Sequence, residues 1–216
     1  MRQDKTQTSG AMALHQPLLD LLTARHVQKI YTDVGSGSHT NISVWQAKLE
    51  SLPEDAYIVG QVAVPAYVSA IPVSSVILVK PLIQSDDYGS LITKPQGYEL
   101  IWNDRGSGGE QDGSFWRVLP QYGYIALGDV ACDGYDPPSS RFTDKYACIR
   151  QDLVCDGVVD PTPLWTDVES GSFKHVSVWN VNGNGVSGFF KAQEGYSRPS
   201  YPVSVLCGGP FWAKLK

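Results

Sequence analysis

The chain has 216 residues, which is the length of one large domain or two small ones. Charged residues make up 18% and aromatic residues 11% of the sequence, with 21 Gly and 14 Pro, a composition typical of an ordered, loop-rich β protein. The net charge of −5 and the scattering of the 17 Lys and Arg argue against a nucleic-acid partner, because phosphate backbones require clustered basic residues. No stretch approaches 18 consecutive apolar residues, so no membrane-spanning helix is predicted.

The first 26 residues are predicted to form an N-terminal arm. Leucines at 18, 19, 21 and 22 favour a short helix over Pro17–Arg25 that covers an edge of the fold. The polar start, Met1 to Ala13, has no apolar run before a small-residue cleavage site, so no secretory signal is predicted. We therefore expect a cytoplasmic protein that is able to attach peripherally to membranes, with secretion by a route without a signal peptide as the alternative.

An internal repeat organises residues 27–208 as a single domain, followed by a tail over 209–216. In each copy an aromatic residue and a tryptophan lie 14 positions apart: 31 and 45, 102 and 116, 165 and 179. Asp, Ser, Gly, a second Ser and Trp recur at the same offsets. The repeats are predicted over residues 27–80, 97–155 and 162–208.

Each repeat contains four short strands: an aromatic-Asp strand, a Ser-x-Trp strand, a strand that ends in glycine and a closing strand. Ile42 and Val44 alternate with Ser43 and Trp45, which is typical of a half-buried strand. A four-stranded sheet cannot bury its apolar face alone, so three sheets must share one core. The predicted fold is all-β: a β-prism of three four-stranded antiparallel sheets with a pseudo-threefold internal repeat. A three-bladed propeller is the poorer alternative, because propellers usually have four or more blades.

The second repeat also carries a family signature. Its segments are Tyr98 to Gly108, Ser114 to Arg117, Gly123 to Val130, the pair Pro137-Pro138 and Cys148 to Leu153. These segments resemble the vacuolar protein sorting-associated protein 62 family, whose members have no established catalytic reaction. A related-looking fold, the multivesicular-body-associated β-prism, is a membrane-binding module, while other β-prisms are lectins or target pore-forming proteins to membranes. The resemblance therefore implies recognition rather than catalysis.

The repeated Asp-x-x-Ser-Gly segment is the best candidate for ligand contact. Its residues are Asp33, Ser36 and Gly37, then Asp104, Ser107 and Gly108, then Asp167, Ser170 and Gly171. The competing interpretation is a tight turn, in which Asp and Ser bond their own backbone. If the three copies gather on one rim, the carboxylates accept hydrogen bonds from sugar hydroxyls. No cofactor or metal is predicted, and Ca²⁺ held by these carboxylates and neighbouring carbonyls is the alternative.

Other residue patterns are better explained by structure than by chemistry. Trp45, Trp116 and Trp179 recur at an offset that favours the core over a stacking platform. Four cysteines, at 132, 148, 155 and 207, allow three disulfide pairings and do not have zinc-site spacing. The glycine-rich segment from Gly106 lacks the lysine of a phosphate-binding loop, and no nucleophile elbow is present. No enzymatic activity and no catalytic residue are predicted.

The sequence thus predicts a non-catalytic module that binds a membrane surface, a lipid headgroup or a membrane-displayed glycan, with a role in vacuolar or membrane trafficking. One alternative is the targeting domain of a pore-forming or toxin-like protein, and another is a lectin for soluble glycans. A purely structural or protein-interaction domain would instead have a stable protein partner and no affinity for lipid or sugar.

Overall fold

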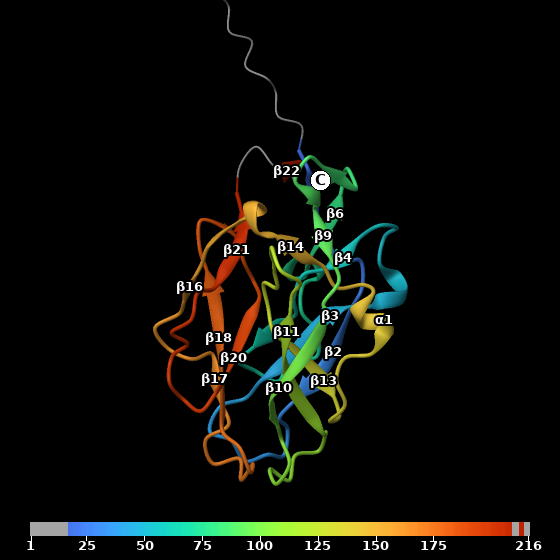
Figure 1. The fold of residues 1–216 in the computed structure, drawn as a ribbon. Coiled ribbons are helices and arrows are strands. Elements are labelled where there is room, and N and C mark those ends of the chain that lie inside the picture. Colours follow the sequence, from blue (N-terminus) through green and yellow to red (C-terminus); the bar gives the residue numbers. More distant parts are fainter. Residues whose placement is uncertain (1–16, 209–211, 214–216) are drawn as a thin grey trace, which may run out of the picture.

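A computed structural model describes residues 17–208, 212 and 213 of the chain (Figure 1). The all-β class is confirmed for this part of the chain. Its one α-helix is the four-residue α1 (Ser140–Thr143), and three 3₁₀ turns occur at Leu49–Ser51, Val73–Ser75 and Gln151–Leu153. Everything else that is regular is strand, so the core is built from the faces of sheets.

Each repeat contributes two sheets built on three antiparallel strands, and two of these six sheets carry a fourth strand. The first sheet of each repeat is built on the Ser-x-Trp strand, which lies between two others. These sheets are β2-β3-β5 (Val27–Thr32, Ser43–Ala47, Val62–Val64), β10-β11-β13 (Gly97–Asn103, Gly113–Leu119, Val130–Asp133) and β17-β18-β20 (Trp165–Thr166, Val176–Asn182, Phe190–Glu194). In the third repeat β16 (Val158–Val159) also pairs with β18, so β16 and β17 together take the place of one longer strand.

The second sheet of each repeat is built on the closing strand. These sheets are β1-β6-β4 (Leu19–Thr23, Ile77–Pro81, Tyr57–Ile58), β9-β14-β12 (Ile92–Thr93, Cys148–Arg150, Tyr124–Ile125) and β15-β21-β19 (Val154–Asp156, Ser204–Cys207, Gly185–Val186). Strand β22 (Trp212–Ala213) runs parallel to β1 at the edge of the first. A small hairpin, β7-β8 (Ser85–Asp86, Gly89–Ser90), lies between the first two repeats.

The prediction of one four-stranded sheet in each repeat is wrong. The glycine-ended and closing strands do not join the first hairpin; the closing strand pairs with the glycine-ended strand on one side and with an extra strand, which precedes the hairpin, on the other. For the first two repeats that strand, β1 or β9, lies before the predicted start at residue 27 or 97. The threefold recurrence itself is confirmed, because the same strand order appears three times, and the β-prism arrangement stays a prediction.

The predicted helix over Pro17–Arg25 is also wrong, since its centre is strand β1. Leu19 and Leu21 are buried while Asp20 between them is half-buried, which is the period of a strand. β1 pairs with β6 along its whole length, from Leu19–Pro81 to Thr23–Ile77. This pairing overrides the local helical preference of the leucines.

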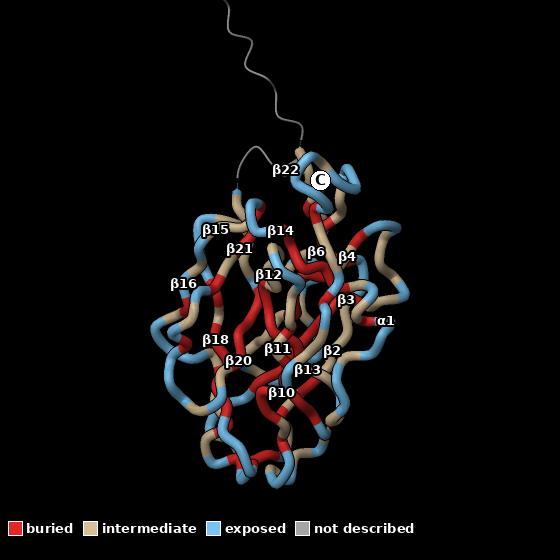
Figure 2. The backbone as a smooth tube through the Cα atoms, viewed as in Figure 1, coloured by how far each residue is buried: buried red, intermediate tan, exposed pale blue. Residues whose placement is uncertain are grey.

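Aromatic side chains from all three repeats meet in the centre of the molecule. Tyr31, Trp102 and Trp165, the first aromatic of each repeat, are each 1% exposed. Phe115 stacks on Trp102 with ring centroids 5.2 Å apart and meets Trp165 edge-on at 6.1 Å. Figure 2 shows this buried interior running along the long axis, with exposed loops around it.

The Ser-x-Trp motif has a structural explanation in every repeat, and the predicted burial of its tryptophans is confirmed. Each indole N–H donates to the serine hydroxyl two residues earlier, at 3.0, 2.8 and 2.8 Å for Trp45, Trp116 and Trp179. Each serine in turn donates to a loop carbonyl, for example Ser114 to Gly134 at 2.6 Å. The motif therefore satisfies a buried donor that would otherwise be costly.

Candidate recognition rim

Three loops gather at one end of the molecule, shown at the bottom of Figure 1 in blue, green and orange. They connect β2 to β3, β10 to β11 and β17 to β18, and they comprise residues 33–41, 104–112 and 167–175. We call this surface the rim. The sequence prediction that the three Asp-x-x-Ser-Gly copies share one end of the fold is therefore met.

A closed ring of backbone hydrogen bonds joins the rim loops. Each loop donates one N–H to the next loop: His39 to Val168 at 3.2 Å, Glu110 to Val34 at 2.8 Å, and Phe173 to Arg105 at 2.9 Å. The three donors occupy one offset in the repeat and the three acceptors another. Because every loop both donates and accepts, no loop can move without breaking two of these bonds.

The repeated aspartates and serines hold the turns. Asp33, Asp104 and Asp167 are 1%, 4% and 1% exposed. In the first and third repeats the carboxylate accepts the N–H of the next strand, from Ile42 and Val176 at 2.9 Å each. Each serine hydroxyl accepts the N–H two residues further on, at 3.3, 3.1 and 3.2 Å for Ser36, Ser107 and Ser170.

Burial of the three carboxylates favours the turn interpretation over ligand contact, and ligand contact at them stays a prediction. All three face inward, and Asp33 and Asp167 accept hydrogen bonds from their own loops. Gly37, Gly108 and Gly171 are exposed on the rim, and ligand contact at their backbone stays a prediction. Within the described part of the chain no group of three His, Cys, Asp or Glu side chains is placed to hold a metal ion.

The three buried carboxylates are not equivalent. The Asp33 carboxylate accepts three hydrogen bonds: from the Ile42 N–H, from Trp165 Nε1 at 2.9 Å and from the Ser38 hydroxyl. Asp104 Oδ1 and Asp167 Oδ2 are buried without a hydrogen-bond partner. Burial raises the pKa of both the Asp104 and the Asp167 carboxyl.

We therefore expect Asp33→Asn to lower the free energy of unfolding by about 1–3 kcal/mol at pH 7, because an amide cannot accept all three bonds. Asp104→Asn is expected to be neutral or stabilising there. A raised pKa means that the folded protein binds the proton more tightly, so Asp104 costs stability as the pH rises from about 4 through its raised pKa. Urea unfolding of both variants between pH 4 and 7 checks this, and equal losses in both would contradict it.

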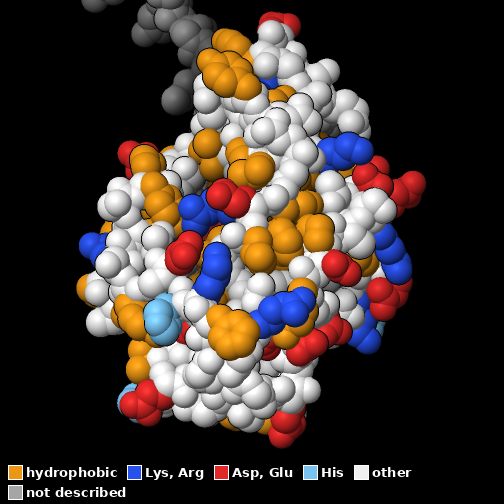
Figure 3. Space-filling view, turned by 60° about the horizontal axis from the view of Figure 1, so that its bottom comes forward, with side chains coloured by type: hydrophobic (Ala, Val, Ile, Leu, Met, Phe, Trp, Pro, Cys, Tyr) orange, Lys and Arg blue, Asp and Glu red, His pale blue; other side chains and the backbone are white. Residues whose placement is uncertain are grey.

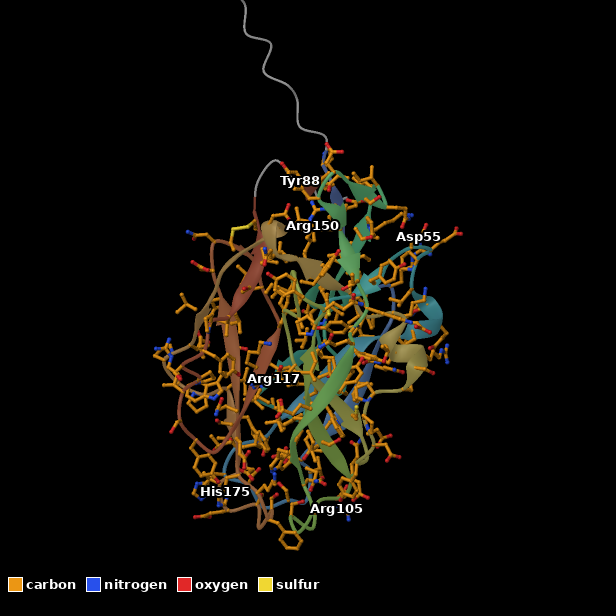
Figure 4. The ribbon with its side chains drawn as sticks, viewed as in Figure 1. Asp55, Tyr88, Arg105, Arg117, Arg150 and His175 are labelled. Carbon is orange, nitrogen blue, oxygen red and sulfur yellow. A yellow bond between two sulfur atoms is a disulfide. The ribbon has the colours of Figure 1, made fainter. Side chains whose placement is uncertain are left out.

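The outer surface of the rim carries an exposed aromatic side chain among charges. Phe173 is 82% exposed, and its ring lies against Gly106, where an added Cβ would approach it to 2.6 Å. Arg105 stacks on the Tyr135 ring at 4.0 Å, and His39 pairs with exposed Glu169 at 2.6 Å. Figure 4 places Arg105 and His175 at this end, and Figure 3, which turns it forward, shows basic, acidic and hydrophobic side chains intermixed.

Sequence reasoning missed Phe173 because its offset in the repeat is occupied by His39 and Glu110 in the other copies. Because phenylalanine occupies this offset in one repeat alone, the residues that recur in all three repeats do not point to it. What the three residues at this offset share is the backbone N–H that bonds the next loop, and any residue except proline provides that group.

The model of the family described as Vps62, vacuolar protein sorting-associated protein 62, matches residues 1–189. The chain belongs to this family. No curated protein matches it.

This Vps62 family member is also similar to a protein of known structure. The crystal structure of GNIP1Aa from Chromobacterium piscinae is 28% identical and superposes with a TM-score of 0.70. The match covers 85% of this chain and 34% of that chain, so this chain spans about a third of its length. In the described residues no helix is long and apolar enough to cross a membrane.

The segment Cys148–Leu153, which carries part of the Vps62 family resemblance, lies far from the rim. Its Arg150 uses every N–H of its guanidinium: two with Asp86, two with Asp152 and one with the carbonyl of Gly89. These contacts are 2.6–3.0 Å long. Arg150 therefore fastens hairpin β7-β8 to the closing strand of the second repeat, and Figure 4 shows it at the end opposite to Arg105.

Proposed function

We propose that this family member is a non-catalytic recognition module whose rim contacts a membrane surface, through a lipid headgroup or a glycan displayed there. The observation that carries the proposal is Phe173, which is 82% exposed, precedes Lys174 in the sequence and donates its backbone N–H to the carbonyl of Arg105. Aromatic side chains favour the membrane–water interface, and basic neighbours are attracted to anionic headgroups. The family name, with its reference to vacuolar protein sorting, agrees with a role at membranes.

The hydrogen-bonded ring supports the proposal because it presents Phe173 on a rigid support. The Phe173 N–H donates one of the three hydrogen bonds that join the rim loops. The phenyl side chain of Phe173 packs on Gly106. A side chain ordered before binding loses less conformational entropy when it binds. With one aromatic anchor and a net charge of −5, we expect weak attachment by a single copy and stronger attachment by several.

Flotation with liposomes tests the proposal. We expect the wild-type chain to float with neutral, anionic or glycolipid-containing vesicles, and the composition that works distinguishes headgroup from glycan. Phe173→Ser should reduce the floated fraction at least about fivefold, since one exposed aromatic anchor contributes on the order of 1 kcal/mol. An EDTA arm tests whether Ca²⁺ contributes.

The matched control is Tyr122→Ser, because Tyr122 is fully exposed at the other end of the fold. On vesicles without glycolipid its flotation should equal that of the wild type, and both variants should keep the wild-type melting temperature. Equal flotation of Phe173→Ser and wild type would remove the rim from the proposal. If the wild type floats with no vesicle composition, the proposal of membrane binding is contradicted.

A second candidate is the targeting portion of a pore-forming or toxin-like protein. It is favoured by one observation: a similar fold occupies 34% of the longer GNIP1Aa chain, where it stands beside other sequence. Release of a dye from liposomes by a protein that contains this chain and a further segment would support it. Release that persists when this chain is removed would contradict it.

A further inference from the structure

A groove lined by tyrosines lies at the end of the molecule opposite to the rim. It has a volume of about 600 Å³ and is lined by Tyr88, Tyr122, Gly123, Tyr124, Arg150, Gln151 and Asp152. We call it the tyrosine groove. Tyr88 is 83% exposed and Tyr122 is 103% exposed, the two most exposed large hydrophobic side chains of the described residues. Exposed aromatic faces of this size beside a hollow are typical of a binding site.

The walls of the tyrosine groove are fixed by hydrogen bonds. Tyr88 lies at the tip of hairpin β7-β8, and its N–H donates to Asp86 at 2.9 Å. Arg150 holds the same Asp86 through both carboxylate oxygens, at 2.6 and 2.8 Å. On the opposite wall the Tyr124 hydroxyl donates to the Ser90 carbonyl at 2.8 Å, which joins the turn that carries Tyr122 to the hairpin.

The charges of the groove select against an anionic ligand. All five N–H donors of Arg150 are already used, so its guanidinium has none left for a phosphate or sulfate. Asp86, which pairs with Arg150 but does not line the groove, and Asp152 together outnumber that one cation, so the ion-pair cluster around Arg150 carries a net negative charge. Arg150 keeps the pKa of the Asp86 carboxyl below its usual value, so this charge persists through the physiological range.

Groups that accept and donate hydrogen bonds remain available beside the tyrosines. The Asp152 side chain is 51% exposed and its oxygens have free lone pairs, and Gln151 is exposed next to it. Two aromatic faces with a carboxylate and an amide between them match a ligand with apolar ring faces and hydroxyl edges.

We infer that the tyrosine groove binds a neutral saccharide, with Tyr88 and Tyr122 against the faces of sugar rings and Asp152 accepting hydrogen bonds from hydroxyls. This site is separate from the rim. It uses a surface that the repeat does not supply, because among the described residues hairpin β7-β8 lies between the first two repeats and has no counterpart after the second.

The test is binding of the labelled full chain to an array of neutral, sialylated and sulfated oligosaccharides. We expect retention on neutral glycans. Tyr88→Ala and Tyr122→Ala should each weaken binding of the best soluble oligosaccharide by about 5- to 30-fold, the loss usual for an aromatic anchor. Both side chains are exposed, so the melting temperature should not change.

Phe173→Ser is the matched control, because it removes an equally exposed aromatic ring at the rim and should leave unchanged the binding of the oligosaccharide that Tyr88→Ala weakens. Retention confined to sialylated or sulfated glycans would overturn the inference, as would retention of no glycan or unchanged binding by both tyrosine variants. Liposomes without glycolipid test the rim alone, so failure of one proposal leaves the other standing.

Discussion

Asp129→Ala is expected to lower the free energy of unfolding by about 3–5 kcal/mol. Asp129 is fully buried and accepts the Ala192 N–H at 2.9 Å, which ties the second repeat to the third. Its carboxylate also lies 3.3 Å from Lys191 Nζ and 3.6 Å from Arg117 Nη2. The variant leaves these cations without their counter-charge, and urea unfolding at pH 7 measures the loss.

A neutral version of the same contact exists between the first and second repeats. Gln46 and Gln61 occupy the positions equivalent to Arg117 and Asp129, as the strand registers show. Gln61 accepts the Ala131 N–H at 2.6 Å and donates to the Ala131 carbonyl at 3.1 Å. In the charged version Arg117 donates to the Ala192 carbonyl at 2.9 Å. Each pair therefore hydrogen-bonds both the backbone N–H and the backbone carbonyl of one alanine in the next repeat.

This equivalence provides a matched rescue. Val130 takes the place of Lys191 in the neutral version, so the combination Arg117→Gln, Asp129→Gln and Lys191→Val rebuilds it in the second interface. We expect this triple variant to lie within about 2 kcal/mol of the wild type, because buried ion pairs are often replaceable by neutral groups of similar shape. A triple variant as unstable as Asp129→Ala would show that the two contacts are not interchangeable.

The repeat made much of the architecture predictable. A fixed spacing between the first aromatic and the tryptophan located the Ser-x-Trp strands, and burial of Trp45, Trp116 and Trp179 followed from their recurrence. The gathering of the three loops also followed, because equivalent loops of a cyclic repeat must lie at the same end. Spacing within one repeat is a local property, and local properties can be read from sequence.

Pairing between distant strands was not predictable in this way. Nothing local distinguishes a leucine-rich helix from β1, whose structure is set by β6 more than 50 residues away in the sequence (Leu21 pairs with Val79). The inward orientation of the three rim aspartate side chains likewise depends on packing against neighbouring loops. Residues that occur once, such as Phe173 and Tyr88, gave no repeated signal, and both candidate surfaces depend on them.

The disulfide between Cys155 and Cys207 supplies the second large expected effect. It links the neighbouring strands β15 and β21, with Cα atoms 4.9 Å apart, and spans 52 residues of sequence. Replacing both cysteines by serine should lower the free energy of unfolding by about 2–4 kcal/mol, because the unfolded chain regains the freedom that the crosslink removed. The wild type should lose the same amount on reduction, while the double variant should not respond to reductant.

Cys132→Ala is the control, because Cys132 and Cys148 form no disulfide and burial raises the pKa of each thiol to about 12. Such thiols ionise little at neutral pH and exchange slowly with the disulfide. We expect this variant to keep the reductant response of the wild type. A wild type that is indifferent to reductant would mean that the bond does not stabilise the fold.

The bond also bears on the compartment in which the protein works. Disulfides persist in oxidising compartments and are rare in the cytosol, so a stabilising Cys155–Cys207 bond favours the alternative of export over the expected cytoplasmic location. Alkylation of the protein as isolated, followed by mass spectrometry without reduction, decides between them. Recovery of the two peptides as one crosslinked species would support an oxidising compartment, where displayed glycans are reached directly. Two alkylated cysteines would support the cytoplasm, where the rim would meet the inner membrane leaflet.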